Sequence, residues 1–463
     1  MRNDTQRGRK LAVGQSVARF RFAALMLTWF AGLSCFAHLA TDSSSTVAIA
    51  AERVAYVHPE QPLDPYYPHR GYAKLTTPQW VGEPEVECVI TLGIDDMRDP
   101  AVYERFLRPI LERLKKIDGR APVSILTCNV KPDDPQIQTW LREGLNIECH
   151  TIDHPCPCLQ GGDFAKARGT YERCVDLMHE IPGNRPVAFR MPCCDSLNTP
   201  SPRFWAEAFG RTTARGRFLQ IDTSVFNIIT AQDPELPPSI VRDAAGGERF
   251  RRYVPFASFV NTIEDYPYPY IIGDKCWEFP CVVPSDWSAQ HVQKPNNPDT
   301  VRDLKLALDA AVLKQGSFNL VFHPHGWIRN EQIVELIDHA VATHGKKVKF
   351  LNFAECLERL NKHLLDGHAI RDAKGDDSGV RLIDVDRDGF QDVVIAHADR
   401  QSLRRWNSTT RTWETRDFAA WAKATSPPDR SASRRIAVDI DGDGTFEAVV
   451  PDVQGDASKA EVW

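Results

Sequence analysis

From residue 86 to residue 365, short apolar runs alternate with longer amphipathic segments. The apolar runs predict strands, of which the first three are 86–94, 122–128 and 146–150. The segments 101–117 and 163–181 carry apolar residues at helical spacing and predict helices, the first with a kink or restart at Pro109. Strands that alternate with helices are typical of parallel β/α units, and about six or seven units in roughly 280 residues suit a barrel. We therefore predict an α/β fold for this part of the chain.

Ionisable or polar side chains repeatedly come directly after the apolar runs. In a β/α barrel the carboxyl ends of the strands meet at one face, and reactive groups lie there. We therefore expect these side chains to gather at a common site, which would contain Asp95, Asp96, Asn129, His150, Arg190, Asp222 and His323.

Two histidines, His150 and His154, stand four positions apart. On one side of a helical turn, two imidazoles at this separation can bind one metal ion. An acidic pair, Asp95 and Asp96, can add a third ligand, which leaves an open position for water as in catalytic zinc sites. Such a metal lowers the pKa of water from 15.7 toward roughly 7, and a second carboxylate can accept the proton. This inventory predicts metal-assisted hydrolysis of an amide or ester.

Four motifs carry a resemblance to a known family. Residues 150–155 read His-Thr-Ile-Asp-His-Pro, residues 91–96 read Thr-Leu-Gly-Ile-Asp-Asp, residues 190–192 read Arg-Met-Pro and residues 321–323 read Val-Phe-His. In this order they resemble the metal and catalytic motifs of the polysaccharide deacetylase (NodB-like) family of carbohydrate esterases. The resemblance implies a distorted (β/α) barrel over residues 86–368 and a carbohydrate polymer or oligosaccharide as substrate.

The resemblance also implies a role for each site residue. Asp95 would be the base and Asp96, with His150 and His154, would hold a divalent metal, Zn²⁺ before Co²⁺ or Ni²⁺. Arg190 would orient the base. His323 would be the acid, with Asp222 as the aspartate that braces it, and His325 is its rival for this role.

The chain departs from the family pattern at two places beside the predicted site. Met97 stands where the family has glycine, and Cys193-Cys194 replaces an aromatic-glycine pair. The chain has twelve cysteines, of which Cys276 and Cys281 are close enough in sequence to pair. Residues 225–300 interrupt the alternation and are rich in aromatics, which either stack on sugar rings or pack a long loop.

An internal repeat begins after residue 376. Residues 380–396 and 436–450 share a pattern of β-branched residues around alternating aspartates and a glycine. Oxygen ligands in this spacing suit Ca²⁺, and the candidate ligands are Asp384, Asp386, Asp388, Asp392, Asp439, Asp441, Asp443 and Glu447. The flanks predict that each loop links two strands. The repeats resemble FG-GAP/VCBS blades of integrin-like β-propellers.

Two partial blades cannot close a propeller. We therefore expect residues 376–463 to be a small β region that packs on the barrel, pairs with a partner chain or domain, or is a remnant.

The first fifty residues predict an export signal. A basic leader precedes an apolar run from Phe22 to Ala37, and Ala48-Ile49-Ala50 fits a cleavage site, so we expect an exported protein. Residues 51–85 are proline-rich and predict an extended lead-in. The net charge of −6 gives no electrostatic footprint for nucleic acid.

Three hypotheses remain open at this point. The first is an exported, metal-dependent hydrolase that removes acyl groups from carbohydrate amides or esters. The second is a non-catalytic surface module that uses its calcium repeats for adhesion, and the third is a barrel hydrolase of a non-sugar C–N bond.

Overall fold

The computed structural model describes residues 67–156, 158, 162–194, 204–254, 261–397 and 400–419, and strands at 436–438, 447–450 and 461–462. The predicted export signal and the first part of the lead-in lie outside these residues. Within the described part of the chain, no helix is long and apolar enough to cross a membrane.

A large mixed sheet forms the centre of the first part of the chain. Its path runs β11-β1-β2-β3-β4-β5-β9-β8, with β12 paired to β1. All neighbouring strands are parallel except β8 and β9. Its strands are β1 Cys88–Met97, β2 Val123–Thr127, β3 Asn146–Cys149, β4 Ala188–Phe189, β5 Ile221–Asp222, β8 Tyr270–Ile272, β9 Cys276–Glu278, β11 Ser317–Phe322 and β12 Val348–Phe350. The predicted α/β fold of parallel units is confirmed. Among the described residues, the sheet is curled and its strand order runs from β11 at one edge to β8 at the other.

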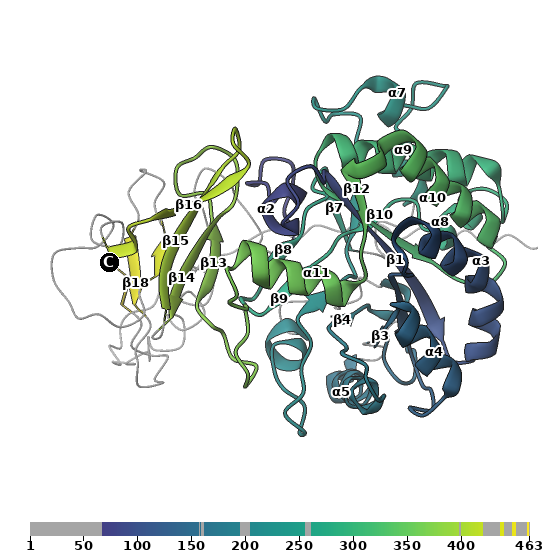
Figure 1. Cartoon of the computed structure of the whole chain (residues 1–463), viewed down its shortest axis with the longest axis horizontal. Coiled ribbons are helices and arrows are strands. Elements are labelled where there is room, and N and C mark those ends of the chain that lie inside the picture. Colours follow the sequence, from purple (N-terminus) through teal and green to yellow (C-terminus); the bar gives the residue numbers. More distant parts are fainter. Residues whose placement is uncertain are drawn as a thin grey trace, which may run out of the picture. The chain divides into compact units, whose positions relative to one another are not determined.

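Helices cover this sheet, and most begin at a side chain that caps the first turn. Asp99, Asp134, Asp163 and Asn297 each accept a hydrogen bond from a backbone N–H of the helix that follows. The helices are α3 Pro100–Asp118, α4 Pro135–Glu143, α5 Phe164–Glu180, α9 Pro298–Leu313, α10 Asn330–His344 and α11 Phe353–Arg359. Helices α9, α10 and α3 lie side by side (Figure 1). Of the kink or restart predicted at Pro109, the restart is wrong, because α3 continues through this residue.

The described residues of the range 225–300, predicted to interrupt the alternation, form short strands and helices. Strands β8 and β9 extend the large sheet, and β10-β6-β7 form a second, parallel sheet. The elements of this region are β6 Phe226–Ile228, α7 Pro238–Val241, η5 Arg251–Tyr253, β7 Thr262–Glu264, β10 Cys281–Val282 and α8 Asp286–Val292. Elsewhere, short helical segments are α2 Thr77–Val81, η3 Pro192–Cys194, η4 Trp205–Phe209, η6 Gly345–Lys347 and η7 Leu360–Leu364.

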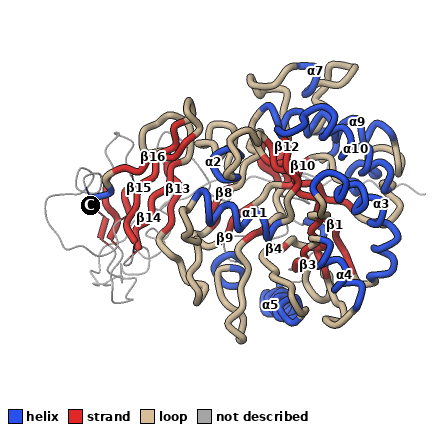
Figure 2. Tube along the Cα trace, in the orientation of Figure 1, coloured by secondary structure: helices blue, strands red, loops and turns tan. Residues whose placement is uncertain are grey.

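The C-terminal region is a run of antiparallel strands (Figure 2). Four strands form one sheet, β13 Val380–Ile383, β14 Asp392–His397, β15 Arg400–Asn407 and β16 Thr412–Arg416. Three form another, β17 Ile436–Val438, β18 Glu447–Val450 and β19 Glu461–Val462. Ile383 faces Asp392 in the first sheet and Val438 faces Glu447 in the second. Each acidic loop therefore links two strands, as predicted.

The first of these sheets contacts the chain that precedes it. Trp413 Nε1 donates to the carbonyl of Gln79 at 2.8 Å, and Arg411 Nη1 donates to that of Pro84 at 2.9 Å. Arg404 Nη1 donates to the carbonyl of His363 at 3.1 Å. Val380 and Val393 are fully buried in the common hydrophobic core. Residues 67–85 are thus not simply an extended lead-in, since they include helix α2, whose residue Gln79 accepts the hydrogen bond from Trp413.

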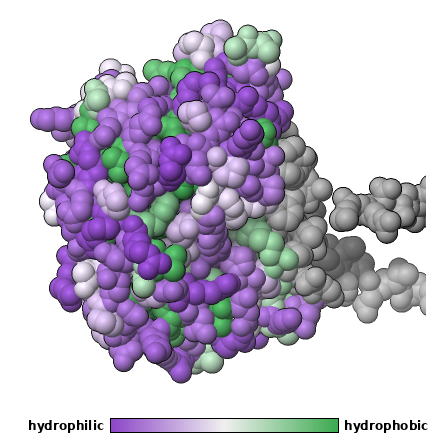
Figure 3. All heavy atoms as spheres, turned by 90° about the vertical axis from the view of Figure 1, so that its right-hand side faces the viewer, coloured by the Kyte–Doolittle hydropathy of each residue, from purple (hydrophilic) through white to green (hydrophobic). Residues whose placement is uncertain are grey.

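The surface over α3 and α10 is largely hydrophilic. On the face shown in Figure 3, hydrophobic residues form small separate groups between hydrophilic ones. Among the described residues of that face, therefore, no broad apolar patch is offered to a partner.

Candidate metal centre and its surroundings

The carboxyl ends of strands β1, β3 and β11 meet at one pocket of about 310 Å³. Asp95 and Asp96 lie near the carboxyl end of strand β1, His150 directly follows β3 and His323 directly follows β11. All four line the pocket, together with His154 from the loop after His150. The gathering expected from the sequence is therefore present for these five residues.

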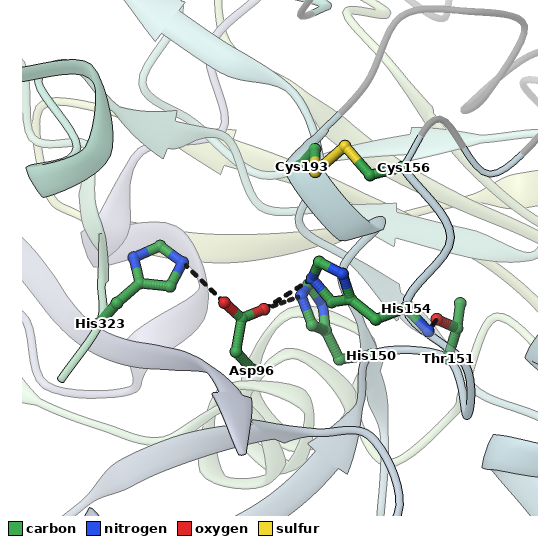
Figure 4. Close-up of a disulfide and its surroundings, with 7 residues drawn as sticks. All are labelled: Asp96, His150, Thr151, His154, Cys156, Cys193 and His323. Carbon is green, nitrogen blue, oxygen red and sulfur yellow. Dashed lines mark hydrogen bonds and ion pairs between the residues drawn. A yellow bond between two sulfur atoms is a disulfide. The ribbon is translucent and has the colours of Figure 1, made fainter. Parts of the chain in front are cut away.

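The carboxylate of Asp96 lies at the centre of this group (Figure 4). Its Oδ1 is 2.7 Å from Nε2 of His154 and 3.2 Å from Nε2 of His150. Burial raises the pKa of Asp96, but hydrogen bonds with His150, His154 and His325 outweigh this and hold the pKa well below its usual range. One carboxylate oxygen and two imidazole nitrogens, all within 4.8 Å of one another, are a donor set suited to a divalent metal.

The orientation of His150 adds a second observation that fits a metal. Its Nδ1 lies 2.8 Å from the backbone carbonyl oxygen of Arg190. A carbonyl only accepts, so Nδ1 carries the hydrogen and donates it. Nε2 is then the nitrogen that would bind an ion shared with Asp96, and it donates to Asp96 when it carries a hydrogen of its own. This outer hydrogen bond is the arrangement by which metal-binding histidines are usually held.

The two histidines do not meet on a helical turn, so that prediction is wrong. The segment after β3 is a loop, in which Thr151 and His154 have φ of 61° and 52°. Asp96 and Cys193 also have positive φ, 69° and 61°. The hydroxyl of Thr151 accepts a hydrogen bond from the backbone N–H of His154 at 3.2 Å. Left-handed residues turn the loop back on itself and bring the two rings to a centroid distance of 5.1 Å.

Asp95 is paired with a buried arginine. Arg190 Nη1 donates to Asp95 Oδ1 at 2.6 Å, and neither side chain is more than 4% exposed. The remaining nitrogens of Arg190 donate to the carbonyl and hydroxyl of Thr223 at 2.9 and 3.0 Å. The guanidinium passes so close to Gly93 that a Cβ there would lie 2.8 Å from Nη1, so glycine leaves it the necessary room. Arg190 is therefore held in contact with Asp95, the residue that it was expected to orient.

His323 is held by an aspartate that the sequence did not identify. Asp286 Oδ1 lies 2.9 Å from His323 Nδ1, and Oδ2 accepts the backbone N–H of His323 at 2.7 Å. Burial lowers the pKa of His323, but the charge and hydrogen bond of Asp286, followed by the charges of Asp95 and Asp96, raise it to about 9. Because Nδ1 donates to Asp286, Nε2 faces the pocket.

The bracing role predicted for Asp222 is corrected accordingly. Asp222 accepts hydrogen bonds from Ser224, and it lies in a buried pair with Glu278. Burial removes both carboxyls from water and so raises the pKa of each. The pair is stable when the two carboxyls share one proton. The sequence did contain a clue to Asp286, which follows the apolar run Cys281-Val282-Val283 and Pro284 much as the other site residues follow theirs.

His325, the rival of His323, also reaches the site. Its Nε2 lies 2.9 Å from Asp96 Oδ2, whereas Nε2 of His323 lies 3.9 Å from the same atom. His325 is the more exposed of the two, at 37% against 11% for the side chain. Among the described contacts, Nδ1 of His323 has a carboxylate partner, Asp286, and Nδ1 of His325 has none. His323 is therefore the better placed proton donor.

A disulfide between Cys156 and Cys193 joins two loops of the site (Figure 4). Cys156 is two residues after His154, and Cys193 is three residues after Arg190. Both cysteines line the pocket. The pairing suggested for Cys276 and Cys281 does not occur, since Cys281 Sγ instead lies 3.1 Å from the carbonyl oxygen of Thr223.

In the first predicted calcium loop, three of the four candidate ligands lie close together. Carboxylate oxygens of Asp384, Asp386 and Asp388 lie within 4.8 Å of one another. Asp392 is apart from this group, because its two oxygens accept backbone N–H groups of Trp406 and Val385 at 2.7 and 3.1 Å. In the second loop, Asp439, Asp441 and Asp443 and the side chain of Glu447 lie outside the described residues.

Comparison with known proteins gives matches of two kinds. Residues 384–450 match the family model described as FG-GAP-like repeat, which confirms that resemblance. No curated protein matches the sequence.

Solved structures that resemble the chain include a "probable polysaccharide deacetylase" from Pseudomonas aeruginosa, with 15% identity, TM-score 0.40 and coverage of 65% of this chain and 98% of that one. They also include the peptidoglycan deacetylase PdaC from Bacillus subtilis, with 15% identity, TM-score 0.29 and coverage of 59% and 92%. A family 4 carbohydrate esterase from Streptomyces lividans follows with 10% identity, TM-score 0.30 and coverage of 57% and 91%. These likenesses are distant and concern the fold, so the roles of the site residues rest on their own geometry.

Proposed function

We propose that this protein is a metal-dependent hydrolase that removes acyl groups, acetyl above all, from carbohydrate amides or esters. The observation that carries the proposal is the convergence of three functions on one pocket. These are a metal-ligand set (Asp96, His150, His154), a carboxylate fixed by arginine (Asp95 with Arg190) and an imidazole fixed by carboxylate (His323 with Asp286).

Asp96, His150 and His154 would hold the metal, with Zn²⁺ favoured by imidazole ligands and Co²⁺ or Ni²⁺ as substitutes. When bound, such an ion polarises the carbonyl to be cleaved and makes water a nucleophile near neutral pH. The site leaves the ion accessible from the pocket, because Asp96 and His154 are each about one-fifth exposed toward it.

Asp95 would act as the general base. Arg190 fixes Oδ1, so the other oxygen is left to take a proton from the attacking water. His323 would act as the general acid. Its Nδ1 is engaged by Asp286, so the proton available for the leaving nitrogen or oxygen of the substrate is on Nε2.

The carbohydrate part of the proposal is supported by the motif resemblance and by the pocket wall. Trp287 and Trp327 line the pocket, are partly exposed, and supply rings of the kind on which sugars stack. The same wall would also suit a non-sugar acyl amide. The experiment therefore includes an outcome for a hydrolase of a non-sugar C–N bond.

The experiment uses metal-free protein reloaded with Zn²⁺ or Co²⁺. Acetate release is measured from acetylated xylan, chitin oligomers and peptidoglycan, beside a series of simple N-acyl amines. Asp95→Asn and His323→Gln serve as inactive controls that keep the metal ligands. Acetate release from a carbohydrate that both variants lose supports the proposal, and cleavage of the N-acyl amines alone supports the non-sugar hydrolase. Carbohydrate binding with no release from any substrate would favour the adhesion module and overturn the proposal.

We also propose that residues 1–50 are an export signal cleaved near Ala50, and that residues 86–368 and 376–463 are the catalytic and repeat regions. N-terminal sequencing of the protein recovered from cell envelope and medium tests the first point. A mature protein that still begins at Met1 would contradict it.

A further inference from the structure

A second cluster of metal-binding side chains lies away from the pocket, between helices α9 and α10. Asp309 on α9 places Oδ1 2.8 Å from Nε2 of His339 and 2.7 Å from Nε2 of His344, both on α10. The three side chains are 24%, 21% and 13% exposed, so they are neither loose on the surface nor sealed in the core. The donor atoms lie within 4.8 Å of one another.

This cluster repeats the donor geometry of the candidate metal centre. There, two imidazole Nε2 atoms converge on Asp96 Oδ1 at 2.7 and 3.2 Å, and here two converge on Asp309 Oδ1 at 2.7 and 2.8 Å. The two sites share no residue, so the second is an independent set of one carboxylate and two histidines.

The outer contacts of His339 also suit a metal ligand. Its Nδ1 lies 3.3 Å from the hydroxyl of Thr343, one turn further along α10. A hydroxyl can accept a hydrogen from Nδ1, and the ring then presents the Nε2 lone pair to an ion. The competing arrangement is a hydrogen-bonded cluster, in which both Nε2 atoms carry hydrogens and donate to Asp309.

The position of the cluster separates it from the hydrolytic pocket. Helix α10 begins shortly after His323 and His325 and runs for 15 residues to His344, a rise of about 20 Å. The cluster therefore lies at the end of the helix remote from those histidines. The carbonyl groups at a helix C-terminus carry partial negative charge, which favours a cation there.

Helices α9 and α10 are already joined one turn away by an ion pair. Lys305 Nζ lies 2.6 Å from Glu335 Oε1, and each residue is four positions before a member of the cluster. Both helices lie next to each other at the periphery of the sheet (Figure 1). An ion held by Asp309, His339 and His344 would add a stronger cross-link at the next turn.

We propose that Asp309, His339 and His344 form a second site for a divalent transition-metal ion, Zn²⁺ or Ni²⁺ by ligand type, which fastens α9 to α10 and takes no part in hydrolysis. Two imidazoles and one carboxylate select these ions over Ca²⁺ and Mg²⁺, which prefer oxygen ligands.

The test counts metal ions in full-length protein that carries no polyhistidine tag. Metal-free protein is dialysed against Zn²⁺ in the micromolar range, and bound zinc is measured by elemental analysis. The wild type is expected to hold two equivalents. His339→Gln/His344→Gln and Asp309→Asn are each expected to lose one and to keep hydrolysis, whereas Asp96→Asn/His154→Gln loses the other.

The matched control is Lys305→Met/Glu335→Leu, which removes the neighbouring ion pair and leaves all ligands in place. It is expected to keep two equivalents and the rise in melting temperature on adding Zn²⁺, a rise that the His339→Gln/His344→Gln variant loses in part. If the His339→Gln/His344→Gln and Asp309→Asn variants hold as much zinc as the wild type, the cluster is a hydrogen-bonded contact only and the proposal is overturned. A wild type with one equivalent that these variants lose supports the second site and counts against the metal of the proposed hydrolase. Should the double variant fail to fold, the Asp309→Asn variant decides by the same count.

Discussion

The carboxylate of Asp286 binds His323 twice, through Nδ1 at 2.9 Å and through the backbone N–H at 2.7 Å. Burial alone would lower the pKa of this imidazole, and Asp286 is the largest influence that raises it to about 9. We predict that Asp286→Asn moves the alkaline limb of the kcat profile to lower pH by at least about one unit, because the proton needed on His323 is lost earlier as pH rises.

The profile is measured with Zn²⁺-loaded protein from pH 5 to pH 10, beside Asp222→Asn as the matched control. Asp222→Asn is expected to leave the alkaline limb in place, since Asp222 contacts Ser224 and Glu278. The assignment of Asp286 would be refuted by a limb that moves in the Asp222 variant and not in the Asp286 variant.

The buried pair of Asp95 and Arg190 predicts an asymmetric response to substitution. Arg190→Met leaves the Asp95 carboxylate buried without its cation, so we expect a loss of about 3–5 kcal/mol in the free energy of unfolding. Asp95→Asn costs less, because Arg190 keeps Thr223 as an acceptor, but it lowers kcat by roughly 10²–10⁴-fold. Urea unfolding and acetate release measure the two effects. The double variant should recover part of the stability of Arg190→Met, and additive losses would contradict the pairing.

The disulfide predicts that metal retention depends on redox state. It ties the loop of His154 to the loop of Arg190, and without it the two loops must be ordered when the metal binds. We expect Cys156→Ser/Cys193→Ser to weaken Zn²⁺ binding at the catalytic site by about tenfold, equivalent to 1.4 kcal/mol. Competition with a chromophoric chelator, with and without reductant, measures this. Reductant should weaken the wild type and leave the variant unchanged, whereas equal affinities throughout would rule the effect out.

The first acidic loop predicts stabilisation by Ca²⁺. Asp384, Asp386 and Asp388 lie close enough to share one ion, which would displace the present contact of Asp386 with Arg405. At 100 times its dissociation constant, Ca²⁺ would add about 2.7 kcal/mol and raise the melting temperature by roughly 5–10 °C. Asp384→Asn/Asp388→Asn should abolish the rise, and substitution of the exposed Asp376 should not. A calcium response that survives in the loop variant would place the ion elsewhere.

The contacts of the first C-terminal sheet predict that it supports the barrel. A chain that ends after residue 378 keeps Arg371, whose guanidinium donates to the carbonyls of Phe209 and Leu219, but loses the sheet that holds Trp413. We expect its melting temperature to fall by about 5 °C or more, since each kcal/mol of packing corresponds to roughly 2–4 °C in a domain of this size. A chain that ends after residue 435 is the control, and it should lose less. An unchanged melting temperature after the longer deletion would show that the sheet adds no support.

The parts of the fold that could be predicted have strong local patterns. Helix α5 lies within the segment 163–181 that predicted it, and strand β1 contains most of the apolar run before Asp95. Local patterns failed where tertiary structure decides the backbone. The spacing of His150 and His154 suits a helix as well as a loop, and only the left-handed residues in the structure distinguish them.

Asp286 was missed for a related reason. It belongs to residues 225–300, which show no periodicity, and its neighbour His323 is 37 positions away in the sequence. The parallel pairing of β10 with β6 and the helix α8 bring them together, and neither could be read from local patterns. Cys193 was noted beside the predicted site, but nothing in the sequence chose its pairing with Cys156 over a pairing with another cysteine.

Left-handed backbone at Asp96, Thr151, His154 and Cys193 has a consequence for selection. Such conformations cost about 1–3 kcal/mol each for residues other than glycine, so the site carries backbone strain. A screen for thermal stability alone would therefore tend to enrich glycine or asparagine at these positions. The variants with the highest melting temperatures would then have lost side chains of the candidate metal centre.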